Sequence, residues 1–229
     1  MRTTSGVPRP RARRVAWICG ISSWTAVILV GVYVKVCGLR TETDVATAVD
    51  AGADAVGFVF ATSPRQIDIP TAQKLIADVP PHVLTVGVFL KQPADEVRQI
   101  ALEAGVGMIQ LHGDYPRETF EELAGLRLMR ATILTPETDV TVGAYGEEML
   151  LLDSPKAGSG EQWDLTRLET SRPDGPWLLA GGLTPGNVRA AIEAAQPWGV
   201  DVSSGVESSR GVKDHDLIRA FVAGAKRDS

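Results

Sequence analysis

Two titratable residues stand at the ends of apolar runs, where they could carry acid–base chemistry. Cys37 closes the run Tyr33–Cys37 and precedes a glycine, and Asp153 closes the run Met149–Asp153. A thiolate can take a proton from carbon when nearby positive charge or N–H groups lower its pKa. Two titratable groups in different environments are what an acid–base isomerisation needs. The alternatives are a small buried hydrophobic role for Cys37 and a loop-capping role for Asp153.

Two glycine-rich turns near the C-terminus predict a binding site for an anion. The first contains Gly181 and Gly182, and the second contains Ser204 and Gly205. Each follows an apolar run and precedes a helical pattern, so backbone N–H groups can converge on one spot that suits a phosphate. In a (β/α)8 barrel, the loops after the last two strands are the usual phosphate site.

Two further charged residues, Arg65 and Asp201, occupy positions that are unusual for a charged side chain. Arg65 follows Pro64 in a stiff turn, which suits a fixed fork for a carboxylate, although a surface charge is the commoner role for arginine. Asp201 lies inside the apolar strand Gly199–Val202, where an unpaired carboxylate is costly. Lys35 shares the strand face of Cys37, so a Lys35–Asp201 ion pair is an alternative, purely structural role for both residues.

The elements that must position these residues repeat along the chain. From Tyr33 onward, short apolar runs alternate with amphipathic stretches. Near-continuous apolar runs are typical of parallel strands that are buried on both faces. The eight predicted strands are Tyr33–Cys37, Ala55–Phe60, Leu84–Phe89, Met108–Leu111, Leu128–Thr132, Met149–Asp153, Trp177–Ala180 and Gly199–Val202.

The stretches between the strands predict helices. Apolar residues share one face in Glu42–Ala51, Ala94–Ala104 and Asp214–Lys226. A further helix is expected over Pro185–Ala195, with Thr184 as its N-cap and Pro185 at the first helical position. The segment Pro136–Glu147 has little helical periodicity, so a loop is expected there.

Alternating strands and helices leave either an open doubly wound sheet or a closed barrel. Eight units in roughly 200 residues fit the small end of the barrel range. No G-x-G-x-x-G follows the first strand, which weakens the dinucleotide-binding alternative. We therefore predict an α/β fold, a single (β/α)8 TIM barrel over residues 32–229 with no second domain. In such a barrel the polar residues named above lie at the carboxyl ends of the strands, where catalytic groups sit.

The composition and net charge limit the classes of partner and cofactor that we expect. The chain has 229 residues and a net charge of −5, and no basic patch lies beyond its first fourteen residues, which argues against nucleic acid as the main partner. Its two cysteines, Cys19 and Cys37, make neither a disulfide framework nor a zinc motif. His112 is interpreted as a core or rim histidine rather than a catalyst. We expect a small phosphorylated substrate, no metal or other cofactor, a cytoplasmic location, and a monomer or homodimer.

Residues 1–31 form an anomalous N-terminal extension. Five arginines precede an uncharged run from Val15 to Val34, which is long enough to span a bilayer and also resembles a signal peptide. The run leads directly into the first predicted strand, and it lacks a small-residue cleavage site. A start site placed too far upstream is therefore favoured over a signal peptide or membrane anchor, and a membrane partner is not expected.

Together these residues resemble the phosphoribosylanthranilate isomerase family, a barrel enzyme family of tryptophan biosynthesis. The first 31 residues have no counterpart in that family. Any one matching motif is weak, but the set spans residues 33–214 in the same order. The motifs are KVCGL (35–39), AGADAVGFVF (51–60), SPR (63–65), VGVF (86–89), QLHG (110–113), LDS (152–154), LAGGL (179–183), NV (187–188), VDVSSGVE (200–207) and GVKD (211–214).

The resemblance implies an Amadori rearrangement of N-(5'-phosphoribosyl)anthranilate to 1-(o-carboxyphenylamino)-1-deoxyribulose 5-phosphate. It implies that Asp153 is the general acid for ring opening and that Cys37 is the general base at C2'. Arg65 would hold the anthranilate carboxylate, and Asp201 would help position the substrate. The residues expected to hold the phosphate are Gly160, Gly181, Gly182, Ser204 and Gly205.

Two rival functions remain at this stage. The histidine-pathway sugar isomerases perform the same chemistry on a similar barrel, but they have an aspartate at the end of the first strand, where this chain has Cys37. They also repeat a phosphate site in each half, whereas this sequence shows one strong site. The second rival is a catalytically silent, membrane-tethered barrel that binds phosphate, which the N-terminal run suggests.

Overall fold

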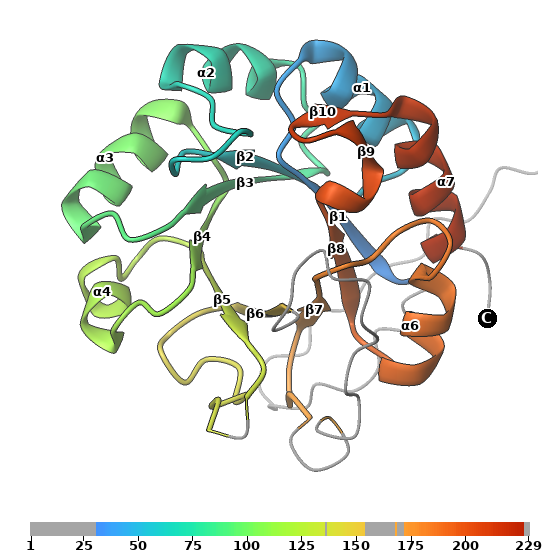
Figure 1. Cartoon of the computed structure of the whole chain (residues 1–229). Helices are drawn as coiled ribbons and strands as arrows, with labels where there is room; N and C mark the ends of the chain where they lie inside the picture. Colours follow the sequence, from blue (N-terminus) through green and yellow to red (C-terminus); the bar gives the residue numbers. More distant parts are fainter. Residues whose placement is uncertain (1–30, 136, 154–167, 169–171, 227–229) are drawn as a thin grey trace, which may run out of the picture.

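Eight parallel strands close into a barrel in sequence order, and the helices lie around it (Figure 1). The computed structural model describes residues 31–135, 137–153, 168 and 172–226. Strand β1 pairs with both β2 and β8, which closes the sheet. The strands are β1 (Tyr33–Cys37), β2 (Ala55–Val59), β3 (Leu84–Phe89), β4 (Met108–His112), β5 (Leu128–Ile133), β6 (Met149–Asp153), β7 (Trp177–Leu179) and β8 (Gly199–Val202).

The described helices follow strands β1, β2, β3, β4, β7 and the hairpin after β8 along the chain. Helix α1 begins with a capping box, in which the Thr41 hydroxyl accepts from Asp44 N–H and the Asp44 carboxylate accepts from Thr41 N–H. Asp68 caps α2 through Thr71 N–H. The described helices are α1 (Glu42–Asp50), α2 (Ile69–Ala77), α3 (Ala94–Ala104), α4 (Arg117–Glu122), α6 (Val188–Ala195) and α7 (His215–Lys226).

A short insertion follows β8. It consists of the 3₁₀ turn η1 (Ser204–Val206) and an antiparallel hairpin of β9 (Glu207–Ser209) and β10 (Val212–Lys213). In Figure 1 this hairpin lies near α1 at one end of the barrel, close to the end of β1.

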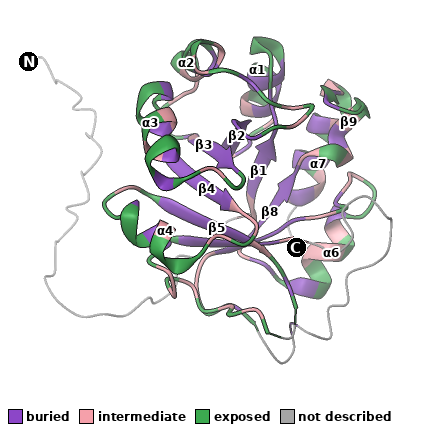
Figure 2. Ribbon diagram, turned by 60° about the vertical axis from the view of Figure 1, so that its left-hand side comes forward, coloured by how far each residue is buried: buried purple, intermediate pink, exposed green. Residues whose placement is uncertain are grey.

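Buried side chains form two layers that the sheet separates. Residues inside the barrel include Met108, Met129 and Leu151, which form their own cluster. Their strand neighbours, such as Leu150 and Leu152, point outward and pack with the helices. Because side chains alternate across a strand, every strand must be apolar on both faces. Figure 2 shows the consequence: the strands are almost entirely buried, and exposed residues lie on the outer faces of the helices.

Every predicted strand is confirmed to within one residue at each end, and so is the barrel. The predicted start of the helix after β7 is wrong, because α6 begins at Val188 with Asn187 as its N-cap. Asn187 has a non-helical φ of −122°, and its side chain accepts from Thr184 N–H at 2.7 Å. Thr184 and Pro185 therefore belong to a hydrogen-bonded turn that precedes the helix.

The connection between β5 and β6 contains no helix over residues 137–148, in agreement with its weak periodicity. Arg130 fills the space beneath it. This outward-facing residue of β5 donates to Glu147 Oε1 at 2.7 Å and to the carbonyl groups of Asp139 and Thr141 at 2.8 and 3.2 Å. Its guanidinium also lies over the ring of Tyr145. One buried cation thus organises the loop that stands where a helix would pack.

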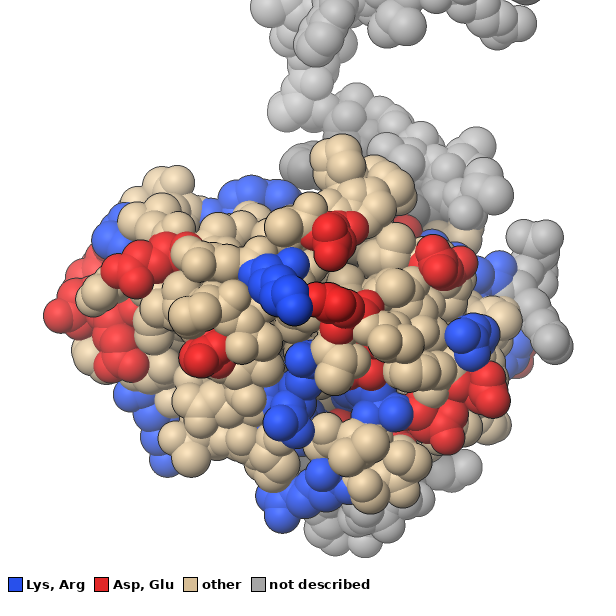
Figure 3. All heavy atoms as spheres, turned by 90° about the horizontal axis from the view of Figure 1, so that it is seen from above, with Lys and Arg blue, Asp and Glu red and all other residues tan. Residues whose placement is uncertain are grey.

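The predicted N-terminal extension lies outside the described residues except for Gly31. Among the helices that the structure describes, none has the length and apolar character needed to cross a membrane. On the face drawn in Figure 3, Lys and Arg side chains lie among Asp and Glu side chains, and no broad area of its described surface carries one sign.

Candidate active site

A cavity of about 370 Å³ opens at the carboxyl ends of the strands. This volume falls within the range of sites for small molecules. Its lining brings together nearly all of the residues that the sequence singled out. Gly160 lies outside the described residues. The predicted site residues that line the cavity are Cys37, Arg65, Asp153, Gly181, Gly182, Asp201, Ser204 and Gly205.

Cys37 ends β1 with its side chain facing the barrel interior. A Cβ at Gly57, on the neighbouring strand, would lie 2.9 Å from Cys37 Sγ and 3.2 Å from Lys35 Nζ. Gly57 therefore leaves the space in which the thiol and the ammonium approach each other. Burial raises the pKa of the Cys37 thiol, and the positive charge of Lys35 opposes that rise by favouring the thiolate.

Lys35 and Asp201 form the ion pair that the sequence left as an alternative. Lys35 Nζ donates to Asp201 Oδ1 at 2.9 Å, and the Lys35 side chain is fully buried. Burial alone would lower the pKa of Lys35, but the Asp201 carboxylate and Cys37 outweigh it and raise that pKa. Because Asp201 also lines the cavity, the pair is part of the site as well as of the barrel interior.

Asp153 ends β6 and lies in the same cavity as Cys37. Its Oδ2 is 4.0 Å from Nε2 of His112, which ends β4 and also lines the cavity. His112, interpreted from the sequence as a core or rim histidine, is thus a neighbour of the predicted acid. The side chain of Asp153 is partly exposed, so its carboxyl group can reach a ligand.

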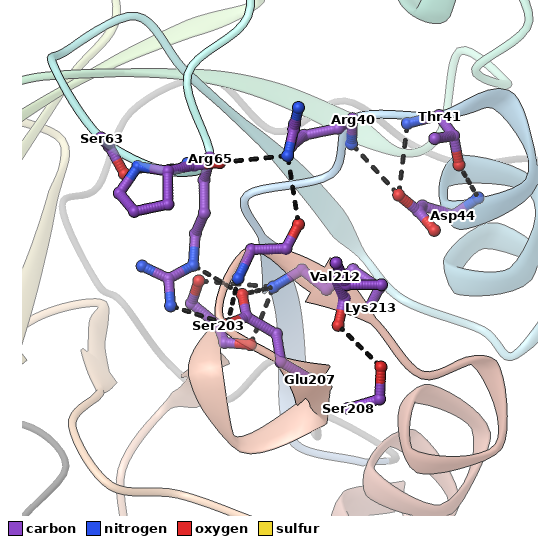
Figure 4. A network of polar contacts seen from close by, with 12 residues as sticks. Arg40, Thr41, Asp44, Ser63, Arg65, Ser203, Glu207, Ser208, Val212 and Lys213 are labelled. Atoms are coloured by element: carbon purple, nitrogen blue, oxygen red, sulfur yellow. Dashed lines mark hydrogen bonds and ion pairs between the residues drawn. The ribbon is translucent and has the colours of Figure 1, made fainter.

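Arg65 lies in the turn after β2, and its position is fixed by Glu207 on β9 (Figure 4). Arg65 Nε donates to Glu207 Oε1 at 2.6 Å, and Arg65 Nη2 donates to Glu207 Oε2 at 2.9 Å. The hydrogen bond to Glu207 raises the pKa of Arg65 further. Glu207 therefore occupies the Nε–Nη2 edge of the guanidinium, and Nη1 has no hydrogen-bond partner among the described residues. Arg65 also lines the cavity.

The two glycine turns touch each other. A Cβ at Gly205 would collide with the carbonyl oxygen of Leu183, so only glycine allows the turn after β8 to pack on the turn after β7. Gly181 and Gly182 both have positive φ, at +88° and +66°, which glycine adopts without strain. Asn187 Nδ2 donates to the Gly182 carbonyl at 2.9 Å and holds that turn in place.

Three residues of the site were not singled out from the sequence. Glu207 and Lys213 stand in short polar strands, where nothing in the pattern separates them from surface charges. Gln110 precedes His112 by two residues, a spacing that places both on one strand face and could have indicated it. Its Oε1 is buried and has no hydrogen-bond partner among the described residues, and Gln110 lines the cavity.

The donor set does not resemble a metal centre. Among the described residues, no three His, Cys, Asp or Glu side chains gather closely enough to bind a metal ion. The cavity instead holds a thiol, a carboxyl group, a fixed guanidinium and two glycine turns. This combination suits a substrate that carries two anionic groups.

Comparison with known proteins shows the family of this chain. The model of the family described as N-(5'phosphoribosyl)anthranilate (PRA) isomerase matches residues 34–224. A curated N-(5'-phosphoribosyl)anthranilate isomerase from Haloferax volcanii is 42% identical over 210 residues, which cover 84% of this chain and 92% of the relative.

Solved structures show the same likeness. The crystal structure of TrpF from Jonesia denitrificans is 49% identical with a TM-score of 0.80, covering 85% of this chain and 96% of that one. A phosphoribosyl anthranilate isomerase in complex with reduced 1-(o-carboxyphenylamino)-1-deoxyribulose 5-phosphate is 36% identical with a TM-score of 0.74, covering 85% and 98%. By sequence and by fold, this chain belongs to the phosphoribosylanthranilate isomerase family.

Proposed function

We propose that this chain converts N-(5'-phosphoribosyl)anthranilate into 1-(o-carboxyphenylamino)-1-deoxyribulose 5-phosphate, a step of tryptophan biosynthesis. The observation that carries the proposal is the meeting of Cys37, Asp153 and both glycine turns in one cavity. Membership of the family supports the same activity. The reaction is an isomerisation, so its protons must return to the substrate by the end.

Ring opening is the first step. Asp153, in its acid form, donates a proton to the ring oxygen of the ribose. The bond between C1' and that oxygen breaks, and the anilino nitrogen lone pair forms a protonated Schiff base at C1'. His112 lies beside Asp153 and belongs to its polar surroundings.

Proton abstraction follows. The Cys37 thiolate takes the proton from C2', and the electron pair of that C–H bond forms a C1'–C2' double bond. The C1'–N π bond breaks at the same time, and its electron pair moves to the nitrogen, which becomes neutral. The resulting enol becomes the ketone when its hydroxyl proton leaves and a proton is delivered to C1'. The Lys35 ammonium beside Cys37 favours the thiolate that this step requires.

The remaining residues hold the substrate on either side of the sugar. The N–H groups of the two glycine turns bind the phosphate, and the free edge of Arg65 binds the anthranilate carboxylate. Asp201, whose other contact is Lys35, helps position the sugar. Gln110 Oε1, which has no hydrogen-bond partner in the described part of the chain, accepts a hydrogen bond from a substrate hydroxyl.

Replacing the acid and the base tests these roles in the full chain. We expect Cys37→Ser and Asp153→Asn each to lower kcat by about 10²–10⁴-fold, because each removes a proton-transfer group. Both substitutions keep the side-chain volume nearly unchanged, so the folded structure should persist in circular dichroism. Product formation by the purified variants is the measurement.

A matched control is Asp78→Asn, which changes an exposed carboxyl group at the end of α2 and should leave kcat unaltered. Turnover at the wild-type rate in Cys37→Ser or Asp153→Asn would refute the assigned role. An unmutated chain that binds phosphate without forming product would favour a catalytically silent barrel.

A further inference from the structure

A buried ionic network joins Arg65 to Glu207 and Lys213, and the proposed reaction uses only Arg65 (Figure 4). Glu207 and Lys213 face each other across the β9–β10 hairpin, with side chains only 4% and 1% exposed. Lys213 Nζ donates to Glu207 Oε1 at 3.0 Å. The same carboxylate receives both bonds from Arg65, and its Oε2 also accepts from Gly211 N–H at 3.0 Å. Every oxygen of Glu207 is therefore engaged.

One arm of the network ends at Arg65. A Cβ at Gly38 would lie 2.7 Å from Arg65 Cδ, so Gly38 allows the arginine to lie flat over the end of β1. Its turn is held as well, because Arg40 Nη1 donates to the Pro64 carbonyl at 3.1 Å and to the Gly211 carbonyl at 3.4 Å. Backbone and guanidinium are both constrained before any ligand binds.

The other arm ends at the second glycine turn. Lys213 Nζ donates to the Ser203 carbonyl at 2.8 Å and contacts Ser203 Oγ at 3.4 Å. Ser203 directly precedes Ser204 and Gly205, which line the cavity. The chain of contacts thus runs from Arg65 through Glu207 and Lys213 to the turn after β8.

The charged partners of Glu207 favour its carboxylate form. Burial alone would raise the pKa of Glu207, but the bonds from Arg65, Gly211 and Lys213 outweigh it and lower that pKa to about 2. Burial lowers the pKa of Lys213, and the Glu207 carboxylate opposes that effect. Arg65 and Lys213 thus contact the same carboxylate from two sides, and Arg65 also lines the cavity.

We infer that Glu207 and Lys213 are positioning residues that set the distance between Arg65 and the turn after β8. They make the site selective for ligands that carry a carboxylate and a phosphate at one particular separation. The inference rests on the proposed function, in which Arg65 holds the carboxylate and the turn holds the phosphate. A rigid spacing helps because a ligand held at both ends loses less affinity to reorganisation of the site.

The test compares a ligand with two anionic groups against a ligand with one. The probes are reduced 1-(o-carboxyphenylamino)-1-deoxyribulose 5-phosphate and inorganic phosphate, measured by titration calorimetry on the full chain. In Glu207→Gln, which weakens the hold on Arg65, we expect the first ligand to bind about 10-fold more weakly or worse, a loss typical for a charge-assisted pair. Inorganic phosphate should bind within about 2-fold of wild type, since its turn is still held by Lys213.

Glu148→Gln is the matched control. Glu148 receives a similar two-bond contact from Arg127, but that pair is half exposed and does not line the cavity. Its removal should change neither affinity. Glu207→Asp, which keeps the charge and the fold while shortening the side chain, should fall between wild type and Glu207→Gln.

The outcomes separate this inference from the proposed function. If the unmutated chain binds neither probe, the proposed function fails and the inference falls with it. If wild type binds both probes and the Glu207 variants keep the same ratio of affinities, the inference is overturned while the function stands. An equal loss for both probes would mean that Glu207 only stabilises the fold, which also overturns it.

Discussion

Two buried ion pairs lie on opposite sides of the same barrel sheet. Lys35–Asp201 faces the interior beneath the cavity, and Arg130–Glu147 faces outward under the β5–β6 connection. The N–O distances are similar, at 2.9 and 2.7 Å. Their surroundings differ. The outer pair is surrounded by backbone partners and an aromatic ring, whereas the inner pair has a thiol on one side and the ligand cavity on the other.

The burial of an ion pair therefore does not show whether the pair serves stability or catalysis. The groups that surround the pair decide between these roles. Removing one partner of either pair leaves a buried charge, which costs about 3–5 kcal/mol of folding free energy. Only the inner pair stands next to a group that is proposed to exchange a proton. We therefore expect both pairs to affect stability and only Lys35–Asp201 to affect catalysis.

The largest expected effect is that of Lys35→Met on turnover. Without the ammonium, burial raises the pKa of Cys37 unopposed by its nearest cation, so less thiolate is present at neutral pH. We expect kcat to fall by about 100-fold, within the range for an impaired general base. The acidic limb of the kcat/KM profile should move to higher pH. An unshifted limb would show that Lys35 does not act on Cys37.

The next effect is the loss of stability in Arg130→Met. Glu147 would remain buried without its cation, so the unfolding free energy should fall by about 3–5 kcal/mol. The kcat of the folded enzyme and its pH profile should stay as in wild type, since the Arg130 side chain lies on the outer face of the sheet, away from the cavity. Chemical denaturation and steady-state kinetics at low temperature measure the two quantities. A shifted pH profile in this variant would contradict the expectation that only the Lys35–Asp201 pair affects catalysis.

The smallest effect concerns alkaline pH. The pKa of Lys35 is raised in the folded protein, so the stabilisation it provides is complete below the unfolded value and is lost as pH rises towards the folded value. Above pH of about 10.4, this loss amounts to at most about 1.4 kcal/mol per pH unit. The double variant Lys35→Met/Asp201→Asn lacks this contribution and should lose less stability there.

Two controls complete the alkaline experiment. Arginine does not titrate in this range, so Arg130→Met/Glu147→Gln should follow the wild-type slope. Tyr33, whose pKa burial raises to about 12, loses its proton in the same range, and Lys35 lowers that pKa, so Tyr33→Phe is introduced into all three proteins. Only the difference between slopes is therefore diagnostic. Equal slopes for the two double variants would contradict the assignment to Lys35.

The sequence alone determined the barrel and most of the site. Strands buried on both faces must be apolar throughout, so their runs were visible, and the polar residues that end them stood out. From these runs alone, Cys37, Asp153 and both glycine turns were predicted to lie at one end of the barrel. The pairing of Lys35 with Asp201 was foreseen as an alternative, because strands one and eight are neighbours in a closed barrel.

Only the tertiary structure decided which charges act on one another. Glu207 and Lys213 were given no role from the sequence, yet the hairpin folds over the end of β1 and buries both against Arg65, which lies 142 residues away from Glu207 in sequence. The start of α6 depended on a bond between the Asn187 side chain and Thr184 N–H. Periodicity reports which face of an element is buried, whereas contacts between distant polar groups arise from the three-dimensional packing of the elements.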